Sequence, residues 1–197
     1  MTRRDIMQTL VVIVCIFLVG VYVFVVSSDN KSKELVKVEN LMRDGFLHDL
    51  KDIIKKDSNG KLNEIESYEQ ASAMLLSARK YDIDWRIVYA LARSEISDFD
   101  YSFHRIYDNG LHDGYGNMQV LLSTAKMFEK DINARTLTVP SRNYDIGVAY
   151  FKSMYGYFGK DLKKAVQSYK RGYKVDSFEE KHWVIFNKFY NKIKSEV

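Results

Sequence analysis

An apolar run of 21 residues without a charge, from Ile6 to Val26, constrains this chain more than any other feature. At about 1.5 Å of rise per residue, a helix of this length matches a bilayer hydrocarbon core that is about 30 Å thick. The run is longer than the apolar core of a cleavable signal peptide, which has roughly 7–15 residues. We therefore expect residues 1–28 to form an uncleaved membrane anchor with a short cytoplasmic tip. A signal peptide cleaved near the small residues Ser27 and Ser28 is the alternative.

The charges beside this run predict its orientation. Arg3 and Arg4 precede it, although Asp5 partly offsets them, and basic residues favour the cytoplasmic side of a membrane. The rest of the chain, from residue 29 onward, is then expected on the opposite side. The only cysteine, Cys15, lies inside the run, so the exported part has no intrachain disulfide and depends on its core for stability.

Composition and motif spacing exclude several kinds of partner. The formal net charge is only +4, and Lys and Asp/Glu residues are interspersed, which indicates a solvated mixed surface rather than a nucleic-acid interface. A metal site needs at least three convergent donors, and the histidines show no ligand spacing. The stretch GYGNMQ lacks the Lys-Ser/Thr pair that follows in a phosphate-binding loop. We therefore expect no nucleic acid, metal or cofactor. The four histidines are His48, His104, His112 and His182.

Most of the chain beyond the apolar run has helical periodicity. Residues 29–64 are predicted to be a juxtamembrane linker and an amphipathic helix, which packs on its own domain, pairs with a second copy or acts as a stalk. Nothing in the later sequence alternates for long enough to form a large sheet. The predicted fold class is therefore all-α, a compact helical globule. Further helices are expected at about 67–78, 85–97, 121–130, 144–158, 162–169 and 178–194.

Glu95 is the first candidate for chemistry. Ser67 and Asp84 are predicted to cap two successive helices, and Glu95 lies near the far end of the second, which has an apolar stripe. A carboxyl group held partly out of water in such a place can act as a general acid. From this stretch alone, an exposed glutamate at the end of a helix is the simpler interpretation.

A second candidate is the stretch GYGNMQVLLSTAK, from Gly114 to Lys126. Two glycines stand close before a predicted helix. Because glycine adopts positive φ angles without strain, Gly-x-Gly in this place indicates a tight turn or a close approach of the backbone to another group.

Three stretches resemble sequence patterns of the soluble lytic transglycosylase (SLT) family of lysozyme-like enzymes, and they follow one another in the order that the family has. The first, YDIDWRIVYALARSE, resembles the family pattern Y-G-[VL]-D-P-x-L-[VLI]-x-A-[IL]-x-x-x-E-S, and Asp84 and Glu95 are 11 positions apart as in the pattern. The second is the glycine stretch, which resembles G-A-x-G-L-M-Q-[IL]-x-P-x-T-A. The third, NYDIGVAYFKSMYGYFGKDLKKAVQSYKRG, resembles N-I-x-x-G-x-x-Y-L-x-x-L-x-x-x-F-x-x-D-x-x-x-A-L-x-x-Y-N-x-G. The matching residues of the second and third stretches are Gly116, Met118, Gln119, Thr124, Ala125, Asn143, Gly147, Tyr150, Phe158, Asp161, Ala165, Tyr169 and Gly172.

The resemblance implies a lysozyme-like fold over residues 65–175 and a substrate, the glycan strand of bacterial peptidoglycan. In this family one glutamate, matched here by Glu95, protonates the glycosidic oxygen between N-acetylmuramic acid (MurNAc) and N-acetylglucosamine (GlcNAc) and then acts as a base. The 6-hydroxyl of MurNAc attacks, so that a 1,6-anhydro product forms without a cofactor. Tyr169 matches a tyrosine that hydrogen-bonds near the catalytic carboxyl group. The implied substrate-binding residues are Gly114, Gly116, Met118, Gln119, Tyr169 and Ser97.

Four residues depart from the family patterns. These departures favour an alternative in which the chain is a catalytically weak scaffold that binds the cell wall. A muramidase, which hydrolyses the same bond, is a second alternative, and it needs another carboxylate to activate water. Candidates for that carboxylate, between Glu95 and the glycine stretch, are Asp98, Asp100, Asp108 and Asp113. The four departures are Ile96, which replaces a serine, Asn117, which replaces a leucine, Leu122, which replaces a proline, and Lys170, which replaces an asparagine.

These interpretations divide the chain into four parts. Residues 1–28 are the anchor and 29–64 the linker with its amphipathic helix, whereas 65–175 form the lytic-transglycosylase-like domain and 176–197 a C-terminal amphipathic helix that packs on it. The expected location is the bacterial inner membrane, with a single span and the catalytic domain on the periplasmic or extracytoplasmic side. Family-level analogy suggests a role in opening the wall for secretion, flagellar or phage-entry machinery.

Overall fold

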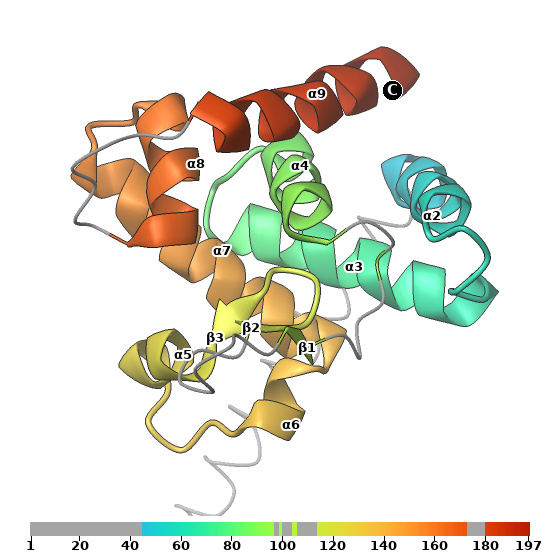
Figure 1. Cartoon of the computed structure of the whole chain (residues 1–197). Coiled ribbons are helices and arrows are strands. Elements are labelled where there is room, and N and C mark those ends of the chain that lie inside the picture. Colours follow the sequence, from blue (N-terminus) through green and yellow to red (C-terminus); the bar gives the residue numbers. More distant parts are fainter. Residues whose placement is uncertain (1–44, 97–98, 100–103, 106–113, 173–179) are drawn as a thin grey trace, which may run out of the picture. The chain divides into compact units, whose positions relative to one another are not determined.

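The structure is a computed structural model that describes residues 45–96, 99, 104–105, 114–172 and 180–197 (Figure 1). The chain divides into two units, residues 1–44 and 45–197, and every described residue belongs to the second unit. The predicted membrane span, residues 6–26, lies outside the described residues. None of the helices in the described part is both long and apolar enough to cross a membrane.

The second unit is mostly helical, as predicted. A small antiparallel sheet, with the strand order β1-β2-β3, departs from the all-α prediction. Its strands have two residues each, which is too short to produce an alternating pattern in the sequence. The helices are α2 (Phe46–Asp57), α3 (Glu64–Lys80), α4 (Trp85–Glu95), α5 (Leu122–Phe128), α6 (Ala134–Leu137), α7 (Pro140–Tyr157), α8 (Leu162–Arg171) and α9 (Glu180–Glu196), and the strands are β1 (His104–Arg105), β2 (Gly114–Tyr115) and β3 (Val120–Leu121).

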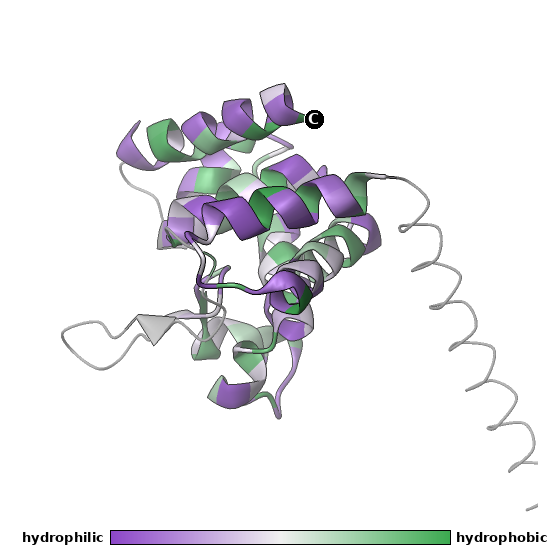
Figure 2. Cartoon of the chain, turned by 90° about the vertical axis from the view of Figure 1, so that its right-hand side faces the viewer, coloured by the Kyte–Doolittle hydropathy of each residue, from purple (hydrophilic) through white to green (hydrophobic). Residues whose placement is uncertain are grey.

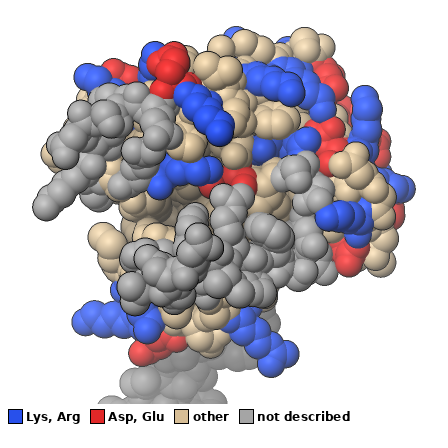
Figure 3. Space-filling view, in the orientation of Figure 1, with Lys and Arg blue, Asp and Glu red and all other residues tan. Residues whose placement is uncertain are grey.

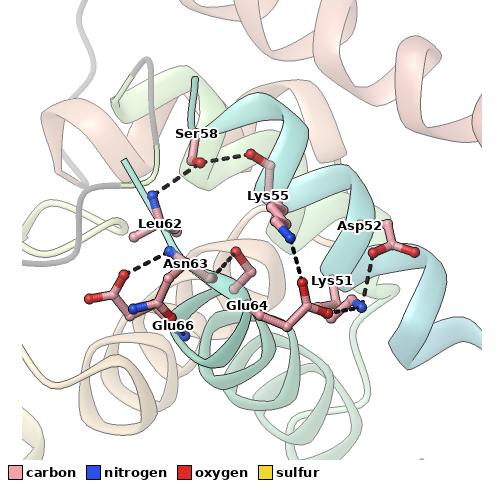
Figure 4. A network of polar contacts seen from close by, with 9 residues as sticks. Lys51, Asp52, Lys55, Ser58, Leu62, Asn63, Glu64 and Glu66 are labelled. Carbon is pink, nitrogen blue, oxygen red and sulfur yellow. Dashed lines mark hydrogen bonds and ion pairs between the residues drawn. The ribbon is translucent and has the colours of Figure 1, made fainter. Parts of the chain in front are cut away.

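Side-chain caps set where two of the central helices begin. Asn63 caps α3, because its side chain accepts a hydrogen bond from the backbone N–H of Glu66 while the Glu66 carboxylate accepts from the N–H of Asn63 (Figure 4). The prediction that Ser67 caps this helix is wrong, since Ser67 lies inside α3 and donates to the Asn63 carbonyl oxygen at 2.8 Å. Asp84 caps α4 as predicted, with its carboxylate accepting from the N–H of Arg86 at 2.9 Å.

A polar network at the start of α3 joins this helix to α2. Glu64 receives hydrogen bonds from Lys51 and from Lys55, the latter at 2.6 Å, and both lysines belong to α2 (Figure 4). In the turn between the helices, the Ser58 hydroxyl donates to the carbonyl oxygen of Lys55 and accepts from the N–H of Leu62. These contacts fix the α2–α3 hairpin at its surface.

The core lies between helices that carry both hydrophobic and hydrophilic residues. Helices α3 and α7 pack against each other, α2 covers another side of α3, and α4 packs on α9 (Figure 1). Each of the longer helices carries both hydrophobic and hydrophilic residues, which Figure 2 shows in green and purple. The largest fully buried side chains are Tyr89, Tyr144, Phe99, Phe151, Phe186, Leu47, Leu50, Ile54, Met74, Leu91, Met118 and Leu137.

A buried charged cluster connects α2, α4 and α9. The carboxylate of Asp57, at the end of α2, accepts hydrogen bonds from the Tyr89 hydroxyl of α4 and from Lys192 Nζ of α9 at 2.7 Å. Arg93 of α4 lies 3.5 Å from the same carboxylate and also stacks on the ring of Phe189 in α9. The C-terminal helix is therefore fixed to α4, the helix that ends at Glu95.

Buried tyrosines make the fold sensitive to high pH. Burial raises the pKa of Tyr89, of Tyr144 and of Tyr169 above the ordinary value of 10.0. Above pH 10 these phenols ionise in the unfolded chain but stay protonated in the folded chain, so the folded state binds more protons. We therefore expect the free energy of unfolding to fall by about 1.4 kcal/mol per pH unit for each such tyrosine. Urea unfolding at several pH values between about pH 9 and about pH 11 measures this fall. A free energy of unfolding that stays constant over that range would contradict the prediction.

Candidate active site

Glu95 is the last residue of α4, and its side chain is only 8% exposed. The helix holds it there because Val88, Leu91 and Ala92 are fully buried and fix α4 in the core. The chain leaves the helix at Ile96 in an extended conformation. The simpler interpretation of Glu95, as an exposed glutamate at the end of a helix, is therefore wrong.

Lys170 contacts the carboxylate of Glu95. Its Nζ atom, on α8, donates to Glu95 Oε2 at 3.0 Å, and the Lys170 side chain is 23% exposed. In the sequence, Lys170 stands out only as a departure from the family's asparagine. Because the two residues are 75 positions apart, no local pattern could have indicated the contact.

Tyr169, the neighbour of Lys170 on α8, connects this corner to the glycine stretch. Its hydroxyl donates to the carbonyl oxygen of Met118 at 2.7 Å. Burial raises the pKa of Tyr169 well above its usual value, and the negative charge of Glu95 raises it further. The phenol therefore stays neutral and keeps its proton for the Met118 carbonyl. Thus Tyr169 lies within electrostatic reach of Glu95, while its hydroxyl is hydrogen-bonded to Met118 in the turn.

Asn143, on α7, holds the turn between β2 and β3. Its Nδ2 donates to the carbonyl oxygen of Tyr115 and its Oδ1 accepts from the N–H of Met118, each at 2.8 Å. Gly116 has φ +62°, and a Cβ atom there would lie 2.4 Å from the Asn143 side chain. Gly116 is thus required by this contact within the protein. The family pattern matches Asn143 but indicates no role for it.

Gly114 and Gln119 face each other across the same turn. A Cβ atom at Gly114 would lie 2.8 Å from Gln119 Oε1, while Gln119 Nε2 donates to the Gly116 carbonyl oxygen at 2.8 Å. The space beside both glycines is therefore filled by the chain's own side chains. The predicted approach of their backbone to a sugar stays a prediction. Gln119 Oε1 is buried and has no hydrogen-bond partner among the described residues.

Met118 and Asn117 contribute to the core more than to a surface. The Met118 side chain is fully buried, and a Cβ atom at Gly147 of α7 would lie 2.7 Å from Met118 Cβ. Asn117, which replaces the family's leucine, is also buried, and its Nδ2 donates to Gln70 Oε1 of α3 at 2.7 Å and to the Phe99 carbonyl oxygen at 3.3 Å. These partners satisfy the Nδ2 of the buried amide, whereas its Oδ1 has no hydrogen-bond partner among the described residues.

Part of the predicted site lies outside the described residues. This applies to Ser97 and to the aspartates considered for a hydrolase, namely Asp98, Asp100, Asp108 and Asp113. Within the described ranges, no three His, Cys, Asp or Glu side chains are grouped so that they could hold a metal ion. On the face seen in Figure 3, basic side chains are spread over the surface with acidic ones among them, rather than gathered in one patch.

The family model of the transglycosylase SLT domain matches residues 72–183, more than half of the chain. The chain belongs to this family. The matched range contains Glu95, Tyr169 and the whole turn from Gly114 to Gln119. The resemblance inferred from the sequence is thereby confirmed.

A solved structure is also similar to this SLT-family chain. It is an inactive mutant of the lytic transglycosylase Slt from Pseudomonas aeruginosa, with 15% identity and a TM-score of 0.45 over 73% of this chain. The chain spans only 26% of that protein's length. No curated protein matches the sequence of the present chain.

Replacing Tyr169 of this SLT domain with Phe should weaken both the fold and the activity. The change removes the hydrogen bond to Met118 and leaves a buried carbonyl oxygen without its donor, which costs about 1–2 kcal/mol. The peptidoglycan cleavage that membership of the SLT family suggests should fall several-fold as well, because the turn is held less firmly. Urea unfolding and product release measure the two effects. Tyr157→Phe, an exposed position on α7, is the control, and equal behaviour of the two variants would contradict the prediction.

Proposed function

We propose that this protein is a membrane-anchored peptidoglycan lytic transglycosylase. It cleaves the bond between MurNAc and GlcNAc and forms 1,6-anhydroMurNAc, with Glu95 as the single general acid and base. The observation that carries this proposal is the buried carboxyl group of Glu95 at the end of α4, in a chain of the SLT family. Tyr169 supports it, because the charge of Glu95 acts on its phenol and its hydroxyl is hydrogen-bonded to Met118 in the turn from Gly114 to Gln119.

In the first step Glu95 acts as an acid. Its carboxyl proton moves to the glycosidic oxygen, the bond from that oxygen to C1 of MurNAc breaks, and GlcNAc leaves with a free hydroxyl group. The N-acetyl oxygen of the same MurNAc stabilises the positive charge that develops at C1, which is why one carboxyl group suffices. The burial of Glu95 supports this step, because a proton donor works best where little water competes for its proton.

In the second step Glu95, now a carboxylate, acts as a base. It removes the proton from the 6-hydroxyl of MurNAc while that oxygen bonds to C1 and closes the 1,6-anhydro ring. Glu95 ends protonated, as it began, with the proton from the 6-hydroxyl replacing the one that left with GlcNAc, and no water is consumed. A firmly held turn favours this intramolecular attack, because the sugar must stay in one orientation through both steps. Asn143 and Tyr169 provide that firmness through their hydrogen bonds to the turn.

The anchor is part of the proposal. Residues 6–26 would span the bacterial inner membrane once, with the domain on the periplasmic or extracytoplasmic side, and the length and apolar character of the run support this. A tethered enzyme acts only on wall close to the membrane, which suits opening the wall for secretion, flagellar or phage-entry machinery. Alkaline carbonate extraction of membranes and protease treatment of spheroplasts test the anchor, and release of the chain by carbonate would reject it.

The decisive experiment is a digest of purified peptidoglycan with the full-length chain in mild detergent, with products read by mass spectrometry. Anhydro-muropeptides support the proposal. Products with a reducing-end MurNAc would identify a muramidase instead. No soluble products, together with retained binding to the insoluble wall, would identify a wall-binding scaffold.

A further inference from the structure

The ammonium group of Lys170 is an unexpected neighbour for a proton donor. It contacts Glu95 Oε2 at 3.0 Å, where the family pattern has a neutral asparagine. Both side chains are mostly withdrawn from solvent, so the ammonium group belongs to the site and is not a freely solvated surface charge.

Lys170 has unused capacity to bind an acceptor. An ammonium group carries three N–H donors. Among the residues that the structure describes, Glu95 supplies the only acceptor within hydrogen-bond distance of Lys170 Nζ. The remaining donors are therefore open to another acceptor that enters the site beside Glu95.

The proposed mechanism requires such an acceptor. Glu95 gives its proton to the glycosidic oxygen only when its carboxyl group is protonated and therefore neutral. In that state Lys170 has lost its counter-charge, and a partly buried ammonium group without a partner is unfavourable. A carboxylate brought by the substrate restores the charge balance just when Glu95 acts as an acid. An uncharged substrate leaves Lys170 unpaired.

We infer that Lys170 binds a carboxylate of the glycan strand beside the scissile bond, and that it makes the enzyme selective for strands that carry one there. This inference rests on the proposed function and specifies its substrate. MurNAc has a 3-O-lactyl group, whose carboxyl group is free where the stem peptide has been removed and is an amide where the peptide is present. Peptide-bearing strands carry their carboxylates on the stem instead. The shared chemistry is a carboxylate close to the MurNAc that is cut.

The test compares three polymers with full-length protein in mild detergent. They are peptide-free glycan strands, the same strands with their lactyl carboxyl groups converted to primary amides, and intact peptidoglycan. We expect the wild-type protein to cut the free-acid strands with a kcat/KM about five- to tenfold above that for the amidated strands. Lys170→Arg, which keeps the charge, should retain most of this preference. Lys170→Asn should bring the ratio close to one.

The ratio of kcat/KM for free-acid strands to kcat/KM for amidated strands does not depend on how much of a variant is folded. Each preparation is tested on both kinds of strand, so any unfolded fraction lowers the two values equally. Two results would overturn the inference while the proposed function stands: a wild type that prefers neither the free-acid strands nor intact peptidoglycan over the amidated strands, or a preference that is unchanged in Lys170→Asn. A preference for intact peptidoglycan over amidated strands that is lost in Lys170→Asn supports the inference and assigns the carboxylate to the stem peptide. No anhydro product from any polymer would overturn the proposed function itself.

Discussion

Replacing Glu95 with Gln should abolish the cleavage of peptidoglycan and leave the domain folded. The amide has nearly the shape of the carboxyl group, and its oxygen still accepts a hydrogen bond from Lys170, so the packing at the end of α4 is kept. An amide cannot deliver the proton that the glycosidic oxygen needs, nor take one from the 6-hydroxyl. General acid–base catalysis contributes roughly 10²–10⁴-fold, and here both steps depend on one group. We therefore expect a loss of at least about a thousandfold.

The measurement is the rate at which soluble muropeptides are released from purified peptidoglycan. Glu64→Gln is the matched control, because Glu64 also pairs with lysines but lies at the surface where α2 meets α3. It should leave the rate unchanged. Far-ultraviolet circular dichroism of the Glu95→Gln protein checks its fold. Cleavage by this variant at the wild-type rate would show that Glu95 is not the proton donor.

The helix that carries Glu95 was predictable because its signals are local. Asp84 caps α4 one residue before the helix begins, and the spacing from Asp84 to Glu95 is fixed by the turns of a single helix. The glycine turn was found in the same way, since Gly116 has the positive φ that glycine favours. Local sequence was misleading where two adjacent signals compete, as Asn63 and Ser67 do at the start of α3.

Contacts between distant residues were not predictable from the sequence alone. Asn143 reaches the turn from α7, and Lys170 reaches Glu95 from α8, so each depends on how whole helices pack. A short sheet escapes detection for a related reason, because strands of two residues are defined by their pairing rather than by a pattern. The residues with the clearest chemical consequence, Glu95 and Lys170, meet only in the folded chain.

Replacing Asp57 with Asn should lower the free energy of unfolding by about 3 kcal/mol. Asp57 is buried and balances two cations, Arg93 from α4 and Lys192 from α9. The amide removes the negative charge but leaves both cations in place. Breaking a buried ion pair in this way costs about 3–5 kcal/mol, and we expect the lower end because Lys192 is 33% exposed and can turn toward water. The Arg93 side chain is only 11% exposed, and it cannot turn toward water without leaving the ring of Phe189.

A comparison within the same helix separates burial from charge. Asp52 of α2 pairs with Lys51 at 3.0 Å but is 67% exposed, so Asp52→Asn should change the free energy of unfolding by less than about 1 kcal/mol. A double-mutant cycle of Asp57→Asn with Lys192→Met should recover part of the loss, because the second change removes one uncompensated cation. Equal, small effects of Asp57→Asn and Asp52→Asn in urea unfolding would mean that the cluster does not hold α9 on α4. A large effect at Asp57 alone would mean that the helix of Glu95 depends on a buried charged cluster that does not include Glu95 itself.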